Sequence, residues 1–243
     1  MCRMLAFSSD WPRDLAPYLA HLARLSVHGK LVDRWEKRPG GNHPDGWGIA
    51  YHREGETSLF RSGMPASTDP SLAGVQGVTD CFLGHARYAD NTETVDAGNA
   101  HPFRLQGIAL AHNGTFRGRI GEEADRRLVS DTLVFLEALA ERWKERTHPG
   151  LCEALSRLLG DADLVGAYSA ATMLIASGNA IFALRNYRKD EDYYTLFVRV
   201  GPDLVVVASE PLDDIPGWRP LANGELLELR LPASKSLFLT EAL

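Results

Sequence analysis

Two kinds of hydrophobic pattern occur along this chain: short apolar runs, and apolar residues at helical spacing. Short apolar runs bounded by Gly, Pro, Asn and Asp are typical of strands. They occur at residues 2–8, 47–52, 81–88 and 108–112 in the first half, and at 170–176, 180–185, 194–200, 204–208, 225–231 and 236–239 in the second. Two of the later runs flank Ser177-Gly178-Asn179, which predicts a hairpin. Strands therefore gather at both ends of the chain.

Helical spacing appears in three places. Leucines at positions 15, 19, 22 and 25 predict a first helix that begins near Asp10-Trp11-Pro12, with Asp as the cap and Pro in the first turn, and ends at Gly29. The strongest pattern covers residues 130–146, where Ser130 is the expected cap. Residues 151–159 predict another helix. Helices packed on stacked antiparallel sheets would satisfy this order.

Composition narrows the class of protein. The 243 residues carry no repeat or linker-like segment, and we expect a single domain over residues 1–243. A net charge of −6 argues against a general nucleic-acid binder or a polybasic membrane anchor. No apolar run is long enough for a membrane span, and the N-terminus lacks the features of a secretory signal. Three widely spaced cysteines then suggest reduced thiols in the cytoplasm.

The second residue is a cysteine, so removal of Met1 would make it N-terminal. Such a residue combines a thiol, which attacks as the thiolate, with an α-amine of pKa about 7.7–8.0 that can serve as the base. A small buried apolar residue on a first strand is the alternative interpretation of Cys2.

Several dense segments follow Cys2 in order. They are NHPDGWG at 42–48, GHARYA at 84–89, NAHPF at 99–103, HNG at 112–114, SDT at 130–132 and ASEPL at 208–212. Together they resemble the class II glutamine amidotransferases, N-terminal-nucleophile hydrolases whose glutaminase domain releases ammonia from glutamine. The resemblance covers nearly the whole chain. It implies an α+β fold, a four-layer αββα sandwich of two antiparallel sheets flanked by helices.

The resemblance also implies roles for five residues. Cys2 would be the nucleophile that forms a γ-glutamyl thioester, and Asn113 and Gly114 would form the oxyanion hole. Arg87 would bind the α-carboxylate of glutamine, and Asp131 its α-ammonium. Taken alone, Arg87 would fit a surface ion pair and Asn113-Gly114 a turn dipeptide. Asp131 alone would fit an acid in the first turn of a helix.

Three histidines, His85, His101 and His112, are candidate ligands of a metal ion. Their spacing supports no known metal motif, so structural or loop-anchoring roles are favoured and neither metal nor cofactor is expected. Asp45 and Gly46 are interpreted as a structural turn near the site.

Asp90 departs from the family pattern, because a threonine usually follows Arg87-Tyr88-Ala89. Extra negative charge there suits a γ-glutamyl compound with a cationic or polar leaving group better than free glutamine. Two enzymatic functions stay open. The protein would be either a glutaminase that supplies ammonia to a separate synthase chain, or a stand-alone hydrolase of a γ-glutamyl metabolite, similar to an enzyme of ergothioneine synthesis. A catalytically idle regulatory or binding module is the alternative from another class. A peptidase or acylase fits less well, because paired Arg87 and Asp131 suit a zwitterion.

Overall fold

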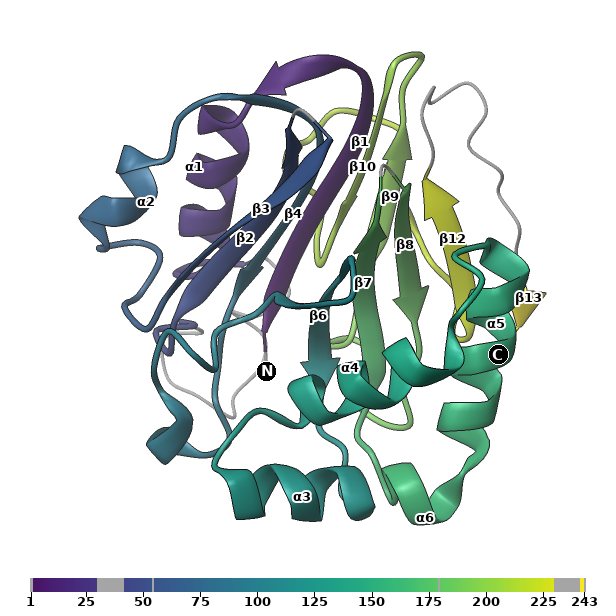
Figure 1. The fold of residues 1–243 in the computed structure, drawn as a ribbon. Coiled ribbons are helices and arrows are strands. Elements are labelled where there is room, and N and C mark those ends of the chain that lie inside the picture. The colour runs from purple at the N-terminus through teal and green to yellow at the C-terminus, as the bar shows by residue number, and fades with distance from the viewer. Residues whose placement is uncertain (1, 30–41, 54, 179, 230–240, 243) are drawn as a thin grey trace.

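In the computed structural model, two antiparallel sheets pack face to face between layers of helices (Figure 1). The structure describes residues 2–29, 42–53, 55–178, 180–229 and 241–242. The first sheet has the strand order β11-β9-β10-β1-β4-β2-β3 and the second β13-β12-β8-β7-β6-β5. This arrangement is the αββα sandwich that the sequence predicts.

The first sheet combines strands from both ends of the chain. Its strands are β1 (Arg3–Asp14), β2 (Trp47–Arg53), β3 (Glu56–Ser62), β4 (Val78–Ala86), β9 (Phe197–Val200), β10 (Leu204–Ala208) and β11 (Arg219–Pro220). β1 lies between β10 and β4, with Leu5 opposite Ala208 and Arg3 opposite Ala86. This register brings the residue before β1, Cys2, to the segment that follows β4.

The second sheet is built mostly from the middle of the chain. Its strands are β5 (Phe103–Leu105), β6 (Ile108–Gly114), β7 (Ala171–Ser177), β8 (Ala180–Arg185), β12 (Glu225–Leu229) and β13 (Glu241–Ala242). The hairpin predicted around residue 178 joins β7 to β8, with Ser177 opposite Ala180. The strand expected at 236–239 lies outside the described residues.

Helices cover the outer face of each sheet (Figure 1). Helices α1 (Ala16–Leu25) and α2 (Pro70–Gly74) pack on the first sheet, and α3 (Arg119–Arg127), α4 (Asp131–Arg142), α5 (His148–Gly160) and α6 (Ala162–Val165) lie on the side of the second. A 3-10 turn, η2 (Thr92–Thr94), follows β4. The helices expected at 130–146 and 151–159 correspond to α4 and α5, and Ser130 caps α4 through the Thr132 N–H.

The predicted start of the first helix is wrong. Residues 10–12 continue β1, and α1 begins at Ala16, where the Asp14 carboxylate accepts the backbone N–H at 3.0 Å. The β1–β4 register shifts between Ser8 and Arg13, so Pro12 occupies a stretch where a missing N–H costs no ladder bond to β4. Pro17, not Pro12, lies in the first turn of the helix.

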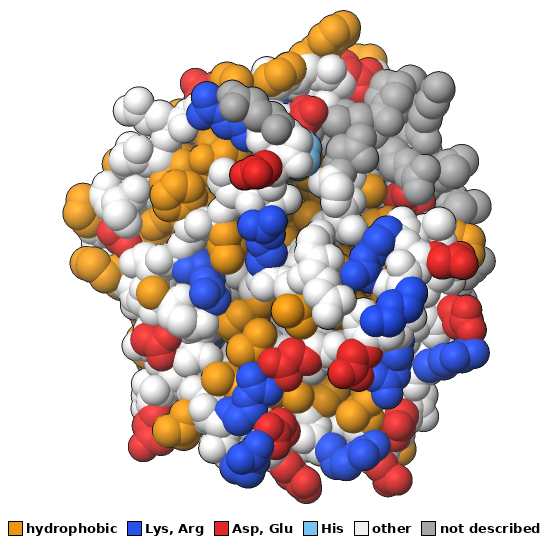
Figure 2. Space-filling model, in the orientation of Figure 1, with side chains coloured by type: hydrophobic (Ala, Val, Ile, Leu, Met, Phe, Trp, Pro, Cys, Tyr) orange, Lys and Arg blue, Asp and Glu red, His pale blue; other side chains and the backbone are white. Residues whose placement is uncertain are grey.

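Three apolar layers follow from this stacking. Small and branched side chains such as Ala6, Leu83, Ala111, Leu174 and Val207 fill the space between the sheets. Leu22 of α1 packs with Leu5, Phe7 and other residues of the first sheet, and a third cluster lies between the second sheet and helices α4 and α5. On the face shown in Figure 2, Lys and Arg side chains are interspersed with Asp and Glu, without a band of one sign.

Leu174 tests the packing between the sheets, because its side chain is fully buried there. We expect Leu174→Ala to lower the free energy of unfolding by about 2–5 kcal/mol, through lost transfer energy and a residual cavity. Val200→Ala, at a position 46% exposed, is the control and should change it by less than about 0.5 kcal/mol. Urea denaturation measures both, and equal effects would contradict the assigned core.

Candidate active site

Cys2 and Asn113 join the two sheets at the start of β1 and the end of β6. The Cys2 backbone N–H donates to Asn113 Oδ1 at 2.9 Å, and Asn113 Nδ2 donates back to the Cys2 carbonyl at 3.0 Å. Asn113 is fully buried. An amide side chain has two N–H groups, so the second remains for another acceptor. This reciprocal pair fixes the main chain of the proposed nucleophile.

The Cys2 thiol lies against the segment that follows β4. The Tyr88 backbone N–H donates to Sγ at 3.4 Å, and Sγ lies 3.7 Å from the Tyr88 carbonyl oxygen. Burial raises the pKa of the thiol, and the Tyr88 N–H and the Arg87 charge offset part of this increase. Since the thiolate is the attacking species, a thiol in this setting needs a nearby base.

Gly114 ends β6 in a conformation that only glycine adopts readily. Its φ is +152°, and a Cβ atom there would overlap the Ala170 carbonyl oxygen. The close approach is set by the pairing of β6 with β7, where Gly114 lies opposite Ala171. The Gly114 backbone consequently lines the same cavity as Cys2.

Arg87 follows β4 and is 5% exposed. Its Nη1 donates to the Thr94 carbonyl at 2.6 Å and its Nη2 to Thr94 Oγ1 at 2.8 Å, so η2 holds one edge of the guanidinium. The backbone around it is bound to the Asp45-Gly46 turn: Arg87 N–H donates to the Gly46 carbonyl, and Ala89 N–H donates to the Asp45 carboxylate at 2.9 Å. The structural role expected for that turn is thereby confirmed.

Asp131 lies in the first turn of α4. Its Oδ2 accepts the Phe116 backbone N–H at 2.7 Å, and its Oδ1 lies 3.4 Å from the hydroxyls of Ser130 and Thr132. A helix start fixes the direction of the carboxylate, and both oxygens have donors.

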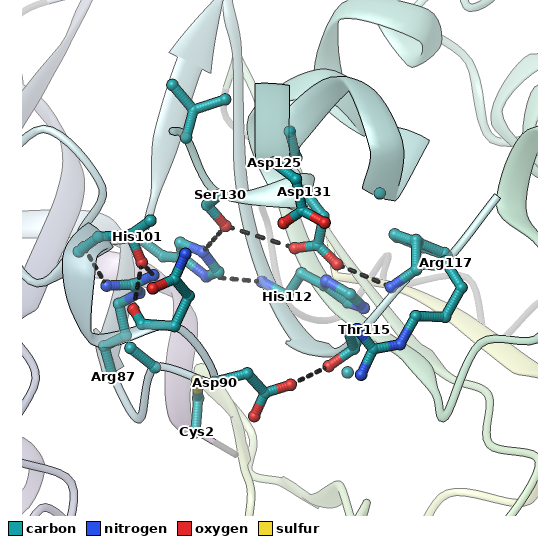
Figure 3. Close-up of a pocket in the computed structure, with 18 of the residues that line it drawn as sticks. Cys2, Arg87, Asp90, His101, His112, Thr115, Arg117, Asp125, Ser130 and Asp131 are labelled. Atoms are coloured by element: carbon teal, nitrogen blue, oxygen red, sulfur yellow. Dashed lines mark hydrogen bonds between the residues drawn. The ribbon is translucent and has the colours of Figure 1, made fainter. Parts of the chain in front are cut away.

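A cavity of about 300 Å³ collects these groups (Figure 3). Cys2, Arg87, Gly114 and Asp131 line it, and Asn113 lies behind Cys2. Five residues predicted from four separate segments are thus brought together. The volume is at the small end of the range for small-molecule sites.

Asp90, whose charge was expected near the site, lines the cavity, and further lining residues were not expected from the sequence. Asp90 accepts a hydrogen bond from Thr115 Oγ1 at 2.6 Å, which links the segments that follow β4 and β6 (Figure 3). Arg117 also lines the cavity, with Glu122 and Asp125 from α3. α3 has few apolar residues, and the buried pair Ile120 and Ala124, four apart, was its only sequence signal.

The three histidines form one buried cluster beside the cavity. His101 Nδ1 lies 3.1 Å from His85 Nε2, and His101 Nε2 lies 2.9 Å from Ser130 Oγ. His112 contacts Thr132 Oγ1 through Nδ1 and the Ala170 carbonyl through Nε2. Each ring is held by protein groups, as a structural role requires. Across the described ranges, no group of three His, Cys, Asp or Glu side chains is arranged to hold a metal ion.

Comparison with known proteins decides the family. Residues 1–202 match the family model of the class II glutamine amidotransferases. The chain belongs to this family. The matched segment covers most of the 243 residues and includes all five candidate site residues.

A curated relative of this chain is the γ-glutamyl-hercynylcysteine sulfoxide hydrolase of Mycolicibacterium smegmatis. The two are 27% identical over 234 residues, which is 95% of this chain and 96% of the relative.

Solved structures have the same fold. A glutamine aminotransferase class-II domain protein from Silicibacter pomeroyi superposes with a TM-score of 0.63 at 22% identity, over 94% of this chain and 95% of that one. The glutamine phosphoribosylpyrophosphate amidotransferase of B. subtilis gives 0.62 at 22% identity, over 95% of this chain but 47% of that one. Among the described helices of this chain, none is long and apolar enough to cross a membrane.

The buried histidines predict a loss of stability in mild acid. Burial lowers the pKa of His85 to about 3, that of His101 well below its usual range, and that of His112 as well. Unfolded histidine has a pKa of about 6.5. As the pH falls below that value, the unfolded chain takes up protons that the folded chain does not, so unfolding becomes more favourable.

We expect the free energy of unfolding to be constant above about pH 7 and to fall below pH 6.5, by up to about 1.4 kcal/mol per pH unit for each histidine. Urea titrations between pH 5 and 7.5 measure this slope while most carboxylates stay ionised. His85→Gln should reduce the slope by about a third. A free energy of unfolding that does not change with pH across this range would refute the conclusion that the three histidines are buried and neutral.

Proposed function

We propose that this protein hydrolyses γ-glutamyl amides with Cys2 as the nucleophile, once Met1 has been removed. The observation that carries the proposal is the shared cavity, which is lined by a thiol, a guanidinium and a carboxylate from three separate segments. Amide hydrolysis of a free γ-glutamyl group needs a nucleophile, a base, an oxyanion site and recognition of two opposite charges.

The main-chain nitrogen of Cys2 supplies the base in this proposal. Asn113 Oδ1 already holds that nitrogen at 2.9 Å, and after removal of Met1 the same atom becomes the α-amine. The amine takes the thiol proton, Sγ attacks the γ-carbonyl carbon, and the amine returns the proton to the departing nitrogen. Water then hydrolyses the γ-glutamyl thioester.

The oxyanion of the tetrahedral intermediate is assigned to Gly114 and Asn113. The Gly114 backbone borders the cavity, and Asn113 retains one N–H beyond the one that it donates to Cys2. Loss of one such donor typically lowers turnover by about 10²–10³.

Arg87 and Asp131 are assigned to the two charges of the γ-glutamyl group. Thr94 holds one edge of the Arg87 guanidinium, which leaves further N–H groups for bidentate binding of an α-carboxylate. Asp131 accepts one backbone N–H and has oxygen lone pairs left for an α-ammonium. Together they favour a free zwitterion over an amide inside a peptide.

The decisive test is labelling with 6-diazo-5-oxo-L-norleucine, a diazoketone analogue of glutamine. We expect native protein to lack Met1 by intact mass and to gain one adduct on the peptide that begins with Cys2. Cys2→Ser should gain none, while Cys81→Ser, at another buried thiol, should label like the wild type. Retention of Met1, or an adduct elsewhere, would overturn the proposal.

A second, finer candidate is a stand-alone hydrolase of a γ-glutamyl compound that has a cationic leaving group. Two observations favour it. Asp90 places a carboxylate in the cavity near Cys2, and the relative from M. smegmatis, which matches over 96% of its length, is a γ-glutamyl-hercynylcysteine sulfoxide hydrolase. The alternative is a glutaminase that delivers ammonia to a separate synthase chain. Its leaving group is ammonia, which has no side chain for the Asp90 carboxylate to bind.

The charge of the leaving group can be varied alone, by comparing γ-glutamylputrescine with γ-glutamylpentylamide. We expect the wild type to prefer the cationic amide about three- to tenfold in kcat/KM, since one partly exposed charge pair contributes on the order of 1 kcal/mol. Asp90→Asn keeps an acceptor for Thr115 and should abolish the preference.

Glu123→Gln is the matched control, because Glu123 pairs with Arg126 on α3 and does not line the cavity. Equal rates for the two amides in the wild type, with rapid turnover of glutamine, would instead favour the ammonia-supplying glutaminase.

A further inference from the structure

A chain of buried polar side chains runs from the first sheet to the start of α4. It consists of His85 on β4, His101 before β5 and Ser130 at the cap of α4, and it ends at Asp131. Figure 3 shows its last three members, His101, Ser130 and Asp131. The proposed chemistry uses Asp131 alone. The hydrogen-bond partners of each group fix which atoms carry hydrogens. With these hydrogens in place, each group donates to the next, from His85 towards Asp131.

His85 is the first donor. Its Nε2 lies 3.3 Å from the His112 carbonyl oxygen, which can only accept. Nε2 therefore carries the hydrogen. The same nitrogen lies 3.1 Å from His101 Nδ1, so it is also oriented to donate there.

His101 passes the hydrogen bond onward. Its Nδ1 receives the His112 backbone N–H at 3.4 Å and faces the donor on His85, so Nδ1 acts as an acceptor. Burial lowers the pKa of His101 well below its usual range, and the ring is neutral with one hydrogen. That hydrogen must be on Nε2, which donates to Ser130 Oγ at 2.9 Å.

Ser130 directs its own hydrogen toward Asp131. Its Oγ accepts from His101 Nε2 and from the Thr132 N–H, while its backbone N–H donates to Asn99 Oδ1 at 2.8 Å. With its lone pairs occupied, the hydroxyl retains its hydrogen for Asp131 Oδ1, which lies 3.4 Å away. The Phe116 N–H holds the other carboxylate oxygen.

We propose that His101, as a neutral Nε2–H tautomer, is a positioning residue that orients the Asp131 carboxylate through Ser130, and thereby sets the affinity of the site for the α-ammonium of the substrate. This rests on the proposed function of Asp131. His101 does not act on the reacting atoms. Removing it should therefore weaken substrate binding and leave turnover nearly unchanged.

Paired inhibitors separate this role from general damage to the cavity. L-Glutamate carries an α-ammonium and glutarate does not, while both keep the carboxylates. For His101→Phe we expect KM for a γ-glutamyl amide and the inhibition constant of L-glutamate to rise about tenfold or more, with kcat within about threefold of the wild type. The inhibition constant of glutarate should change less than twofold.

Further variants isolate the relay. His101→Gln places an amide N–H near the position of Nε2 and should restore most of the affinity. Ser130→Ala should reproduce the His101→Phe effect, and the double variant should be no weaker than Ser130→Ala, because both changes break one chain. His148→Phe, at a histidine equally buried but in the core between β8 and α5, should leave all three constants unchanged. These comparisons also keep the test valid if His101→Phe fails to fold.

The tautomer is measurable without any activity. Side-chain ¹⁵N spectra of the wild type should show His101 protonated at Nε2 and not at Nδ1. A hydrogen on Nδ1, or parallel changes in the constants for L-glutamate and glutarate, would overturn the relay. An enzyme that hydrolyses no γ-glutamyl amide, with the spectrum as expected, would instead overturn the proposed function and leave the tautomer chain in place.

Discussion

The reciprocal amide contact between Cys2 and Asn113 is the constraint on which the site depends. It joins Cys2, the residue before β1 of the first sheet, to Asn113 near the end of β6 in the second, 111 positions away in the sequence. Both hydrogen bonds are buried, so neither can be exchanged for water without cost. The stacking of the two sheets therefore fixes where the thiol lies. Other elements then complete the cavity: the segment after β4 brings Arg87, and α4 brings Asp131.

Polar groups are concentrated where the two sheets and α4 meet, although apolar side chains fill most of the space between the sheets. Buried polar groups are tolerated only when they are paired, and three neutral histidines here pair with serine, threonine and backbone carbonyls. Such a network is costly to disturb, and it holds its members in one arrangement. The same property underlies the acid sensitivity that we expect and the proposed orientation of the Asp131 carboxylate.

Much of the fold follows from local patterns. The hairpin around residue 178, the helix capped by Ser130 and the runs that became β6, β7 and β10 were all predictable, because apolar runs bounded by turn residues and helix caps are short-range signals. The first helix begins at Ala16 and not near Asp10, because the pairing of β1 with its two neighbours outweighed a local capping signal. α3 was missed, since its buried positions are few.

The sequence by itself determined the family, the αββα fold that the family implies and the candidate roles of five residues, because the motifs after Cys2 keep their order and their residue types. Only the tertiary structure decided their neighbours. The Asp90–Thr115 link, the Thr94 contacts of Arg87 and the direction of the histidine chain arise between segments distant in sequence. Hydrogen-bond geometry depends on the stacking and register of the sheets, and neither is encoded in any short stretch of residues.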